Sequence, residues 1–210
     1  MSIEKILASA PVVPVVVIEK LEDAAPLARA LYNGGLKPLE ITLRTPIAAE
    51  AVKLMKAEVP EAYVGTGTVV DKASFEASVA AGADFMVSPG VNDELLALAK
   101  ETDIPFLPGA ATPSEVMKLA SHGFKFLKFF PAEAAGGTAM IKSIGGPLPQ
   151  VTFCPTGGIS LATAPNYLAL SNVICVGGTW MLDKKLIENK DWQAIETLAR
   201  QACEVNRSQK

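Results

Sequence analysis

The sequence predicts an α/β protein, a parallel (β/α)8 barrel of the TIM-barrel class with a short extra helix at its N-terminus. Eight short apolar or β-branched segments recur along the 210 residues, and successive segments begin 20 to 27 residues apart. Helix-like segments lie between them, which is the pattern of strands in a parallel sheet. An open doubly wound sheet is the rival fold, but it usually has fewer strands, and no G-x-G-x-x-G motif follows the first apolar segment.

The apolar segments predict the strands. They cover residues 12–18, 39–43, 63–67, 85–88, 106–108, 126–129, 151–154 and 173–176. Half of the chain is hydrophobic and only 6% is aromatic, so Ala, Val, Leu and Ile dominate the apolar residues. That composition is typical of parallel strands that are buried on both faces and covered by helices.

Helix signals fill the intervals between the strands. Predicted helices cover residues 3–8, 23–32, 46–57, 72–81, 93–100, 113–121 and 191–206. Asn92 and Thr112 are favourable N-terminal caps, and Pro113 suits the first helical position. Gly123 follows another helix, where glycine commonly ends one. We expect the whole chain, 1–210, to form one domain because no linker or low-complexity tract divides it.

Charge and composition exclude several classes of function. The formal net charge is −3 and no long basic run is present, so we expect neither nucleic acid nor a membrane surface as a partner. The apolar run 11–18 is too short to span a membrane, and no secretory signal begins the chain, so a cytoplasmic setting is expected. The cysteines match no zinc spacing, and the single histidine excludes a three-histidine site. Carboxylates can also bind magnesium, but no segment resembles such a site, so we expect no metal.

The segment FLKFFPAE, residues 126–133, sets one lysine, Lys128, among aromatic rings. Desolvation favours the neutral form of an amine, and a neutral amine is a nucleophile toward ketones. Lys128 is therefore a candidate Schiff-base lysine, with Phe130 on the same face of the strand. The alternative is a lysine at a strand edge, whose stem covers its neighbours while its ammonium group reaches water.

A second polar group lies on the predicted strand 39–43. Because side chains alternate along a strand, Glu40, Thr42 and Arg44 share one face, and in a barrel the polar face points inward. One interpretation is a proton-transfer carboxylate beside an arginine that grips a substrate carboxylate. The other is a buried ion pair that fixes the register of the sheet.

Glycine-rich segments follow the last two predicted strands. Thr156, Gly157 and Gly158 follow one, and Gly178 and Thr179 follow the other. In many barrels the loops after strands 7 and 8 bind phosphate through backbone N–H groups. Each segment alone could be a tight turn, but their joint position favours a phosphate site.

Six segments together resemble the 2-keto-3-deoxy-6-phosphogluconate (KDPG) aldolases, which often also act as 4-hydroxy-2-oxoglutarate (KHG) aldolases. They are LEITLRT (39–45), GTGTV (65–69), SPG (88–90), LKFFPAE (127–133), CPTGGI (154–159) and GGTW (177–180). The resemblance spans nearly the whole chain. Two departures are Thr179, where the family usually has serine, and GTG at 65–67, which often reads GAG.

The resemblance implies a class I aldolase of the Entner–Doudoroff pathway that needs no metal or cofactor. It implies that Lys128 forms the Schiff base and that Glu40 is the general acid/base. Carried over in the same way, the substrate-binding residues are Arg44, Thr68, Pro89, Phe130, Thr156, Gly157, Gly158, Gly178 and Thr179. The implied partner is a phosphorylated keto acid, and the family is typically homotrimeric.

Three alternatives stay open at this point. A 2-keto-3-deoxy-6-phosphogalactonate aldolase is a close cousin, although such enzymes tend to lack the TLRT and CPTGGI segments. An isomerase or synthase barrel would use a charged lysine only for electrostatics. A non-catalytic barrel would bind a sugar phosphate without forming an imine.

Overall fold

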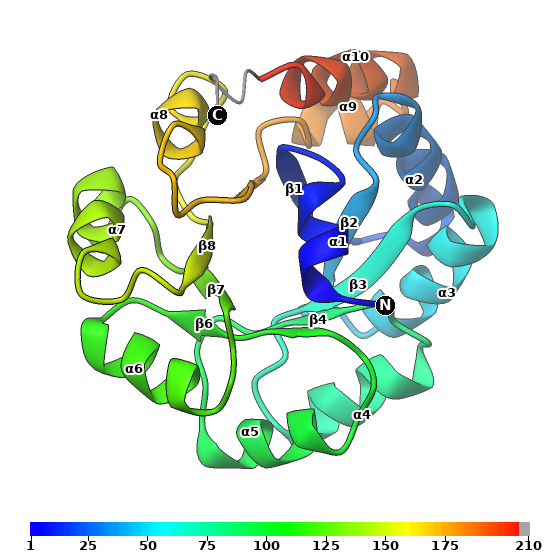
Figure 1. Cartoon of the computed structure of the whole chain (residues 1–210). Helices are drawn as coiled ribbons and strands as arrows, with labels where there is room; N and C mark the ends of the chain where they lie inside the picture. Colours follow the sequence, from blue (N-terminus) through cyan, green and yellow to red (C-terminus); the bar gives the residue numbers. More distant parts are fainter. Residues whose placement is uncertain (206–210) are drawn as a thin grey trace.

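The structure, a computed structural model, describes residues 1–205 and has parallel strands surrounded by helices (Figure 1). The strands are β1 (Val12–Val16), β2 (Pro38–Thr42), β3 (Tyr63–Gly67), β4 (Met86–Val87), β5 (Phe106–Leu107), β6 (Gly109–Ala110), β7 (Phe126–Phe129), β8 (Thr152–Pro155) and β9 (Val176–Gly178). The helices are α1 (Ile3–Ala8), α2 (Ala24–Asn33), α3 (Ala48–Glu58), α4 (Lys72–Ala80), α5 (Asp93–Lys100), α6 (Pro113–Ser121), α7 (Gly137–Gly145), α8 (Ala164–Leu168), α9 (Lys184–Glu188) and α10 (Trp192–Cys203), with a 3-10 turn η1 (Leu21–Asp23) before α2.

Within residues 1–205 the strands form two parallel sheets. Six strands, in the order β5-β4-β3-β2-β1-β9, make a sheet that curls into a half-barrel, and the second sheet has the order β6-β7-β8. Within the runs β1 to β5 and β6 to β8, strands that follow one another along the chain are neighbours, and β1 lies between β2 and β9. The doubly wound alternative is therefore wrong, because its strand order reverses partway through the sheet.

Two places join the sheets. Pro108 alone separates β5 from β6, so one extended segment contributes to both sheets. Isolated parallel bridges pair Phe153 with Val173 and Thr156 with Gly177, which brings β8 beside the segment that leads into β9. The strand predicted at 106–108 thus divides around Pro108, since proline cannot donate to a ladder. The strand predicted at 173–176 begins later and extends through Gly178.

Most helices lie where they were predicted, and local capping explains their starts. The side chains of Asp71 and Thr112 each accept a backbone hydrogen bond in a complete capping box, at α4 and α6. Helices α7, α8 and α9 were not predicted: α7 is bounded by glycines, and the other two have five residues each. The helix predicted at 191–206 ends at Cys203, and residue 206 lies outside the described residues.

Helix α1 covers the end of the strands where each strand begins. Its Ile6 and Leu7 are at most 1% exposed and pack with Val13, Phe85 and Leu107 in a cluster distinct from the larger core under the outer helices. The carboxyl ends of the strands, where side chains for chemistry would gather, lie at the other end.

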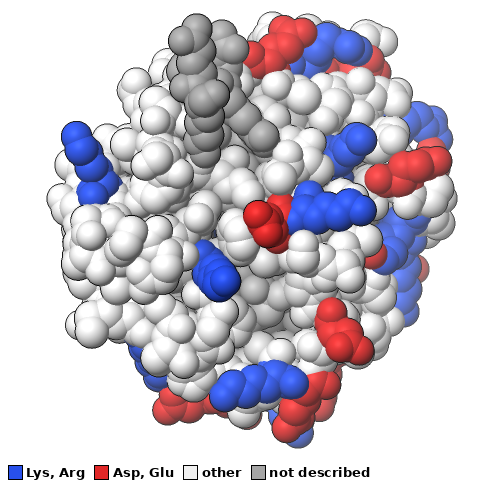
Figure 2. Space-filling model, viewed as in Figure 1, with Lys and Arg blue, Asp and Glu red and all other residues white. Residues whose placement is uncertain are grey.

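The face shown in Figure 2 carries basic and acidic side chains interspersed among uncharged ones. None of the helices in residues 1–205 is both long enough and apolar enough to cross a bilayer.

Candidate active site

Lys128 and Glu40 form a buried ion pair at the centre of the site. Lys128 lies on β7 and Glu40 on β2, and they are 6% and 3% exposed. The Nζ of Lys128 donates to Oε1 of Glu40 at 3.2 Å. Two residues 88 positions apart are thus brought together, and an amine lies within proton-transfer distance of a carboxylate.

Strand alternation explains how these charged side chains come to face inward. Leu39 and Ile41, on either side of Glu40, pack in the outer core, and so do Leu127 and Phe129, on either side of Lys128. The polar residue between each pair is forced to the opposite face. Inward placement of both groups follows from the apolar pattern alone.

Thr42 and Phe130, which were expected on the same faces, complete the surroundings of this pair. Thr42 is buried, and its hydroxyl donates to the carbonyl of Val16 on β1 at 3.0 Å. The Nζ of Lys128 stands 5.4 Å from the centre of the Phe130 ring, a cation–π contact. One wall of the lysine's surroundings is therefore aromatic and the other is a carboxylate.

A cavity of about 160 Å³ opens over Lys128. Its lining residues come from the carboxyl ends of several strands: Val15, Arg44, Lys128, Phe130, Thr156, Gly157, Gly158, Ile159, Gly177, Gly178 and Thr179. Most of the side chains singled out from the sequence therefore meet at one cavity. Glu40, Thr68 and Pro89 do not line it, although Glu40 pairs with Lys128 and Thr68 with Arg44, which do.

Thr68 and Pro89 contact residues of the site without lining the cavity. Thr68 adopts a left-handed backbone with φ 63°, and its hydroxyl accepts a hydrogen bond from Nε of Arg44 at 3.2 Å. A β-branched residue in that conformation is strained, and such strain is common at functional sites. Pro89 packs against Gly109, whose register partner on β7 is Lys128.

The two glycine-rich segments differ in why they need glycine. Gly157 and Gly158 have φ of 105° and 78°, which other residues rarely adopt. A side chain at Gly178 would instead collide with the ring of Trp180, 2.8 Å from its Cη2. Among the residues that the structure describes, the N–H groups of Gly158 and Ile159 have no hydrogen-bond partner. They are backbone donors at the rim of the cavity.

Val15, Ile159 and Gly177 line the cavity although they were not singled out from the sequence. Val15 follows from the fold, since β1 pairs with β2 at Val15–Glu40. Gly177 leaves room for Thr156, because a methyl group there would stand 2.9 Å from Cγ2 of that threonine. Ile159 could have been found as the residue that directly follows the two glycines.

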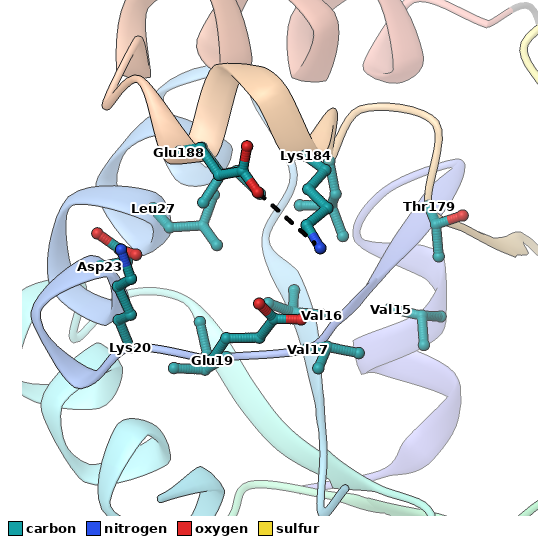
Figure 3. A pocket seen from close by; sticks show the side chains of 13 residues that line it. Val15, Val16, Val17, Glu19, Lys20, Asp23, Leu27, Thr179, Lys184 and Glu188 are labelled. Atoms are coloured by element: carbon teal, nitrogen blue, oxygen red, sulfur yellow. Dashed lines mark ion pairs between the residues drawn. The ribbon is translucent and has the colours of Figure 1, made fainter. Parts of the chain in front are cut away.

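A second cavity, of about 230 Å³, lies beside the end of β1, with Val15, Val16 and Val17 in its wall (Figure 3). It meets the first at Val15 and Thr179, and its wall includes Lys184, which pairs with Glu188 at 3.9 Å. Neither Lys128 nor Glu40 lines it. The lysine chemistry therefore belongs to the smaller cavity.

Within residues 1–205 no three His, Cys, Asp or Glu side chains gather closely enough to hold a metal ion. The site thus consists of an amine, a carboxylate, a guanidinium group, hydroxyls and backbone amides. A buried lysine beside a carboxylate, under a cavity rimmed by glycines, is the arrangement expected of an α/β enzyme that activates a ketone through an imine.

Comparison with known proteins agrees with this class. The family model for KDPG and KHG aldolase matches residues 3–198. The KHG/KDPG aldolase of Escherichia coli strain K12 is 49% identical over 203 residues, which cover 97% of this chain and 95% of that protein. The chain belongs to the KDPG and KHG aldolase family.

Two solved structures are similar throughout. The KDPG aldolase of Legionella pneumophila, with pyruvate captured at low pH as a covalent carbinolamine intermediate, has a TM-score of 0.93 and 46% identity, covering 96% of this chain and 98% of that one. The enzyme of Zymomonas mobilis ZM4 with 3-phosphoglycerate has a TM-score of 0.93 and 43% identity, covering 98% and 96%.

Proposed function

We propose that this protein is a class I aldolase that cleaves KDPG to pyruvate and glyceraldehyde 3-phosphate through a Schiff base on Lys128. The observation that carries the proposal is the Lys128 amine, 6% exposed and 3.2 Å from the Glu40 carboxylate under the glycine-rimmed cavity. Membership of the KDPG and KHG aldolase family supports the substrate. The carbinolamine formed by the Legionella relative supports covalent chemistry.

The reaction begins with attack of the Lys128 amine on the C2 ketone. Glu40 first takes a proton from the Lys128 ammonium group, which frees the amine to attack. It then passes this proton, and a second one from the attacking nitrogen, to the C2 oxygen, so that water leaves and an iminium forms. Glu40 then accepts the proton of the C4 hydroxyl. The electrons of the C3–C4 bond move into the iminium, which gives an enamine and releases the aldehyde. Protonation at C3 and hydrolysis return pyruvate and the free lysine.

The remaining residues hold the two ends of the substrate. We assign the carboxylate to Arg44 and Thr68, because the threonine hydroxyl accepts from Nε of the arginine and leaves its terminal nitrogens for a substrate. Pro89 and Phe130 shape the pocket for the pyruvyl group. We assign the phosphate to the glycine-rich rim and its backbone donors, at Thr156, Gly157, Gly158, Gly178 and Thr179.

KHG is a second substrate in this proposal. The E. coli relative carries both activities in its name. KHG and KDPG share the keto acid end that reaches Lys128, and they differ at the end that carries the phosphate. The same imine chemistry yields pyruvate and glyoxylate.

We also propose that the two sheets act as one closed (β/α)8 barrel. Closure is supported by the position of β1 between β2 and β9 and by the bridges Phe153–Val173 and Thr156–Gly177. The family resemblance supports a homotrimer and a cytoplasmic enzyme.

Borohydride trapping tests the proposed function. Incubation with pyruvate and sodium borohydride should add one reduced three-carbon group to Lys128, located by peptide mass spectrometry. Lys125, exposed just before β7, is the internal control. An adduct on Lys125, or no adduct while the sugar phosphate still binds, would overturn the aldolase proposal. It would favour a barrel that binds its ligand without forming an imine at Lys128.

A further inference from the structure

Tyr167 and Glu133 form a hydrogen bond beside the glycine-rich loop, outside the set of residues that line the cavity. Tyr167, on α8, is 1% exposed, and its hydroxyl donates to Oε1 of Glu133 at 2.6 Å. Burial first, and then this hydrogen bond, raise the pKa of the Tyr167 hydroxyl well above its usual value. The tyrosine therefore stays protonated and keeps donating.

The turn that contains Glu133 also holds the loop through its backbone. The N–H groups of Ala132 and Glu133 donate to the carbonyls of Thr156 and Gly157 at 2.8 and 3.1 Å. The side chain of Glu133 lies directly against Gly158, where an added methyl group would stand 2.7 Å from its Cγ. One face of the glycine-rich loop is thus in contact with Glu133.

The other side of the loop leads into α8. Ser160 and Thr163 bind each other's side chains and backbone at the start of that helix, and Tyr167 follows within it. The Tyr167–Glu133 hydrogen bond therefore links the turn after β7, which contacts one face of the glycine-rich loop, to α8, into which the loop leads. Glycines with positive φ have little intrinsic preference for one shape, so their neighbours must fix it.

From these contacts we infer that Glu133 and Tyr167 are positioning residues for the phosphate end of the substrate. Neither touches the substrate: they hold Gly157 and Gly158 so that the backbone N–H groups of Gly158 and Ile159 face the cavity. The inference rests on the proposed function, and it adds a selective consequence. Loss of the hydrogen bond should weaken recognition of the phosphate and leave the imine chemistry at Lys128 unchanged.

Steady-state kinetics with two substrates test the pair. Tyr167→Phe removes one hydroxyl and keeps the ring, and Tyr63→Phe, at the start of β3, is the matched control. A hydrogen bond to a carboxylate changes an equilibrium by roughly ten- to 150-fold. Because this pair positions the loop and does not touch the substrate, we expect only part of that effect, about three- to tenfold. Tyr167→Phe should raise KM for KDPG, and the inhibition constant of inorganic phosphate, by about that factor, with kcat within about twofold. KM for KHG and borohydride trapping of pyruvate should match the wild type.

Two changes at Glu133 separate hydrogen bonding from charge. Glu133→Gln keeps an oxygen that accepts from Tyr167 and should behave like the wild type, whereas Glu133→Ala should reproduce or exceed the Tyr167→Phe defect with phosphate. Equal changes for both substrates, no change for either, or a Gln variant as impaired as the Ala variant would overturn the inference. A wild-type protein that neither traps pyruvate nor cleaves KDPG would instead overturn the proposed function, and the role of the pair with it.

Discussion

Gly67 on β3 makes room for the carboxylate of Glu40 on β2. A methyl group at Gly67 would stand 2.7 Å from Cγ and 2.8 Å from Cδ of Glu40, closer than real side chains approach each other. Glu40 is 3% exposed and paired with Lys128, so it has little space into which to retreat. The absence of a side chain at Gly67 therefore sets where the proposed acid/base group stands.

Gly67→Ala should lower kcat while the protein stays folded. The added methyl group pushes the Glu40 carboxylate away from Lys128, and a displacement of about 1 Å at a reacting group can cost roughly 10²-fold in rate. Cleavage assays and the rate of borohydride trapping with pyruvate measure the effect.

Gly65→Ala is the control on the same strand. Its methyl group would meet the buried ring of Phe85, 2.6 Å from Cε1, and not Glu40. Overpacking of this kind costs about 1–3 kcal/mol of folding free energy. The melting temperature should therefore fall, while the cleavage rate of the folded enzyme should stay close to that of the wild type. If both variants lose the same factor in rate, the loss in Gly67→Ala does not come from displacement of Glu40.

Glu40→Gln should slow cleavage by about 10²–10⁴-fold, the usual contribution of a general acid/base. The amide keeps the shape of the side chain and a hydrogen bond to Lys128, so circular dichroism should stay close to the wild type, while the melting temperature should fall because the buried ammonium loses its counter-charge. Glu133, the next carboxylate along the chain from Lys128, accepts its hydrogen bond from Tyr167 and does not line the cavity. A Glu40→Gln enzyme with near wild-type rate would leave the proton transfer without an assigned group.

Gly178→Ala should destabilise the protein through Trp180. The new methyl group would overlap the indole ring, and the resulting repacking costs about 1–3 kcal/mol, which lowers the melting temperature by several degrees in a chain of this size. Replacing the indole as well, in Gly178→Ala with Trp180→Leu, should restore part of that stability. If the single variant melts like the wild type but loses activity with KDPG and not with KHG, the glycine at 178 is needed for phosphate binding and not for the packing of the indole.

Glu115→Ala should reduce stability at neutral pH but not in acid. Backbone hydrogen bonds, chiefly from the N–H of Ala111, lower the pKa of Glu115 below its ordinary value of 4.5. The folded state therefore favours the carboxylate, and this stabilisation is present above the unfolded pKa and is lost as pH falls through the folded pKa. Urea unfolding should show a gap of about 1 kcal/mol between variant and wild type at pH 7, closing toward pH 3. Since Ala is a better helix former than Glu, helix propensity cannot cause a loss, and a gap that is constant with pH would show that the charged carboxylate of Glu115 is not its source.

The inward placement of Lys128 and Glu40 could be predicted from the sequence because it depends only on alternation and on the fold class. Apolar residues flank both groups, and the order of strands then brings β2 and β7 to opposite sides of one site. The helix predicted over residues 3–8 is also confirmed. It could be predicted because its cap and its apolar face depend only on neighbouring residues. The prediction of one domain over 1–210 stays a prediction.

Contacts between side chains could not be predicted in this way. The need for glycine at 178 depends on where the ring of Trp180 folds back, and the need at 67 depends on a carboxylate from the neighbouring strand. Tyr167 lies on a five-residue helix that contains Pro165, too short to leave a periodic signal. The division of one strand at Pro108 likewise follows from pairing on both sides, which composition does not record.

Helix α1 has a practical consequence for handling the protein. Because Ile6 and Leu7 close the end of the strands opposite Lys128, anything attached ahead of Met1 emerges on the face away from the cavity. A surface linker or a fused partner at that terminus should therefore leave the path of substrate and products open, whereas removal of residues 1–9 would expose the apolar cluster to water.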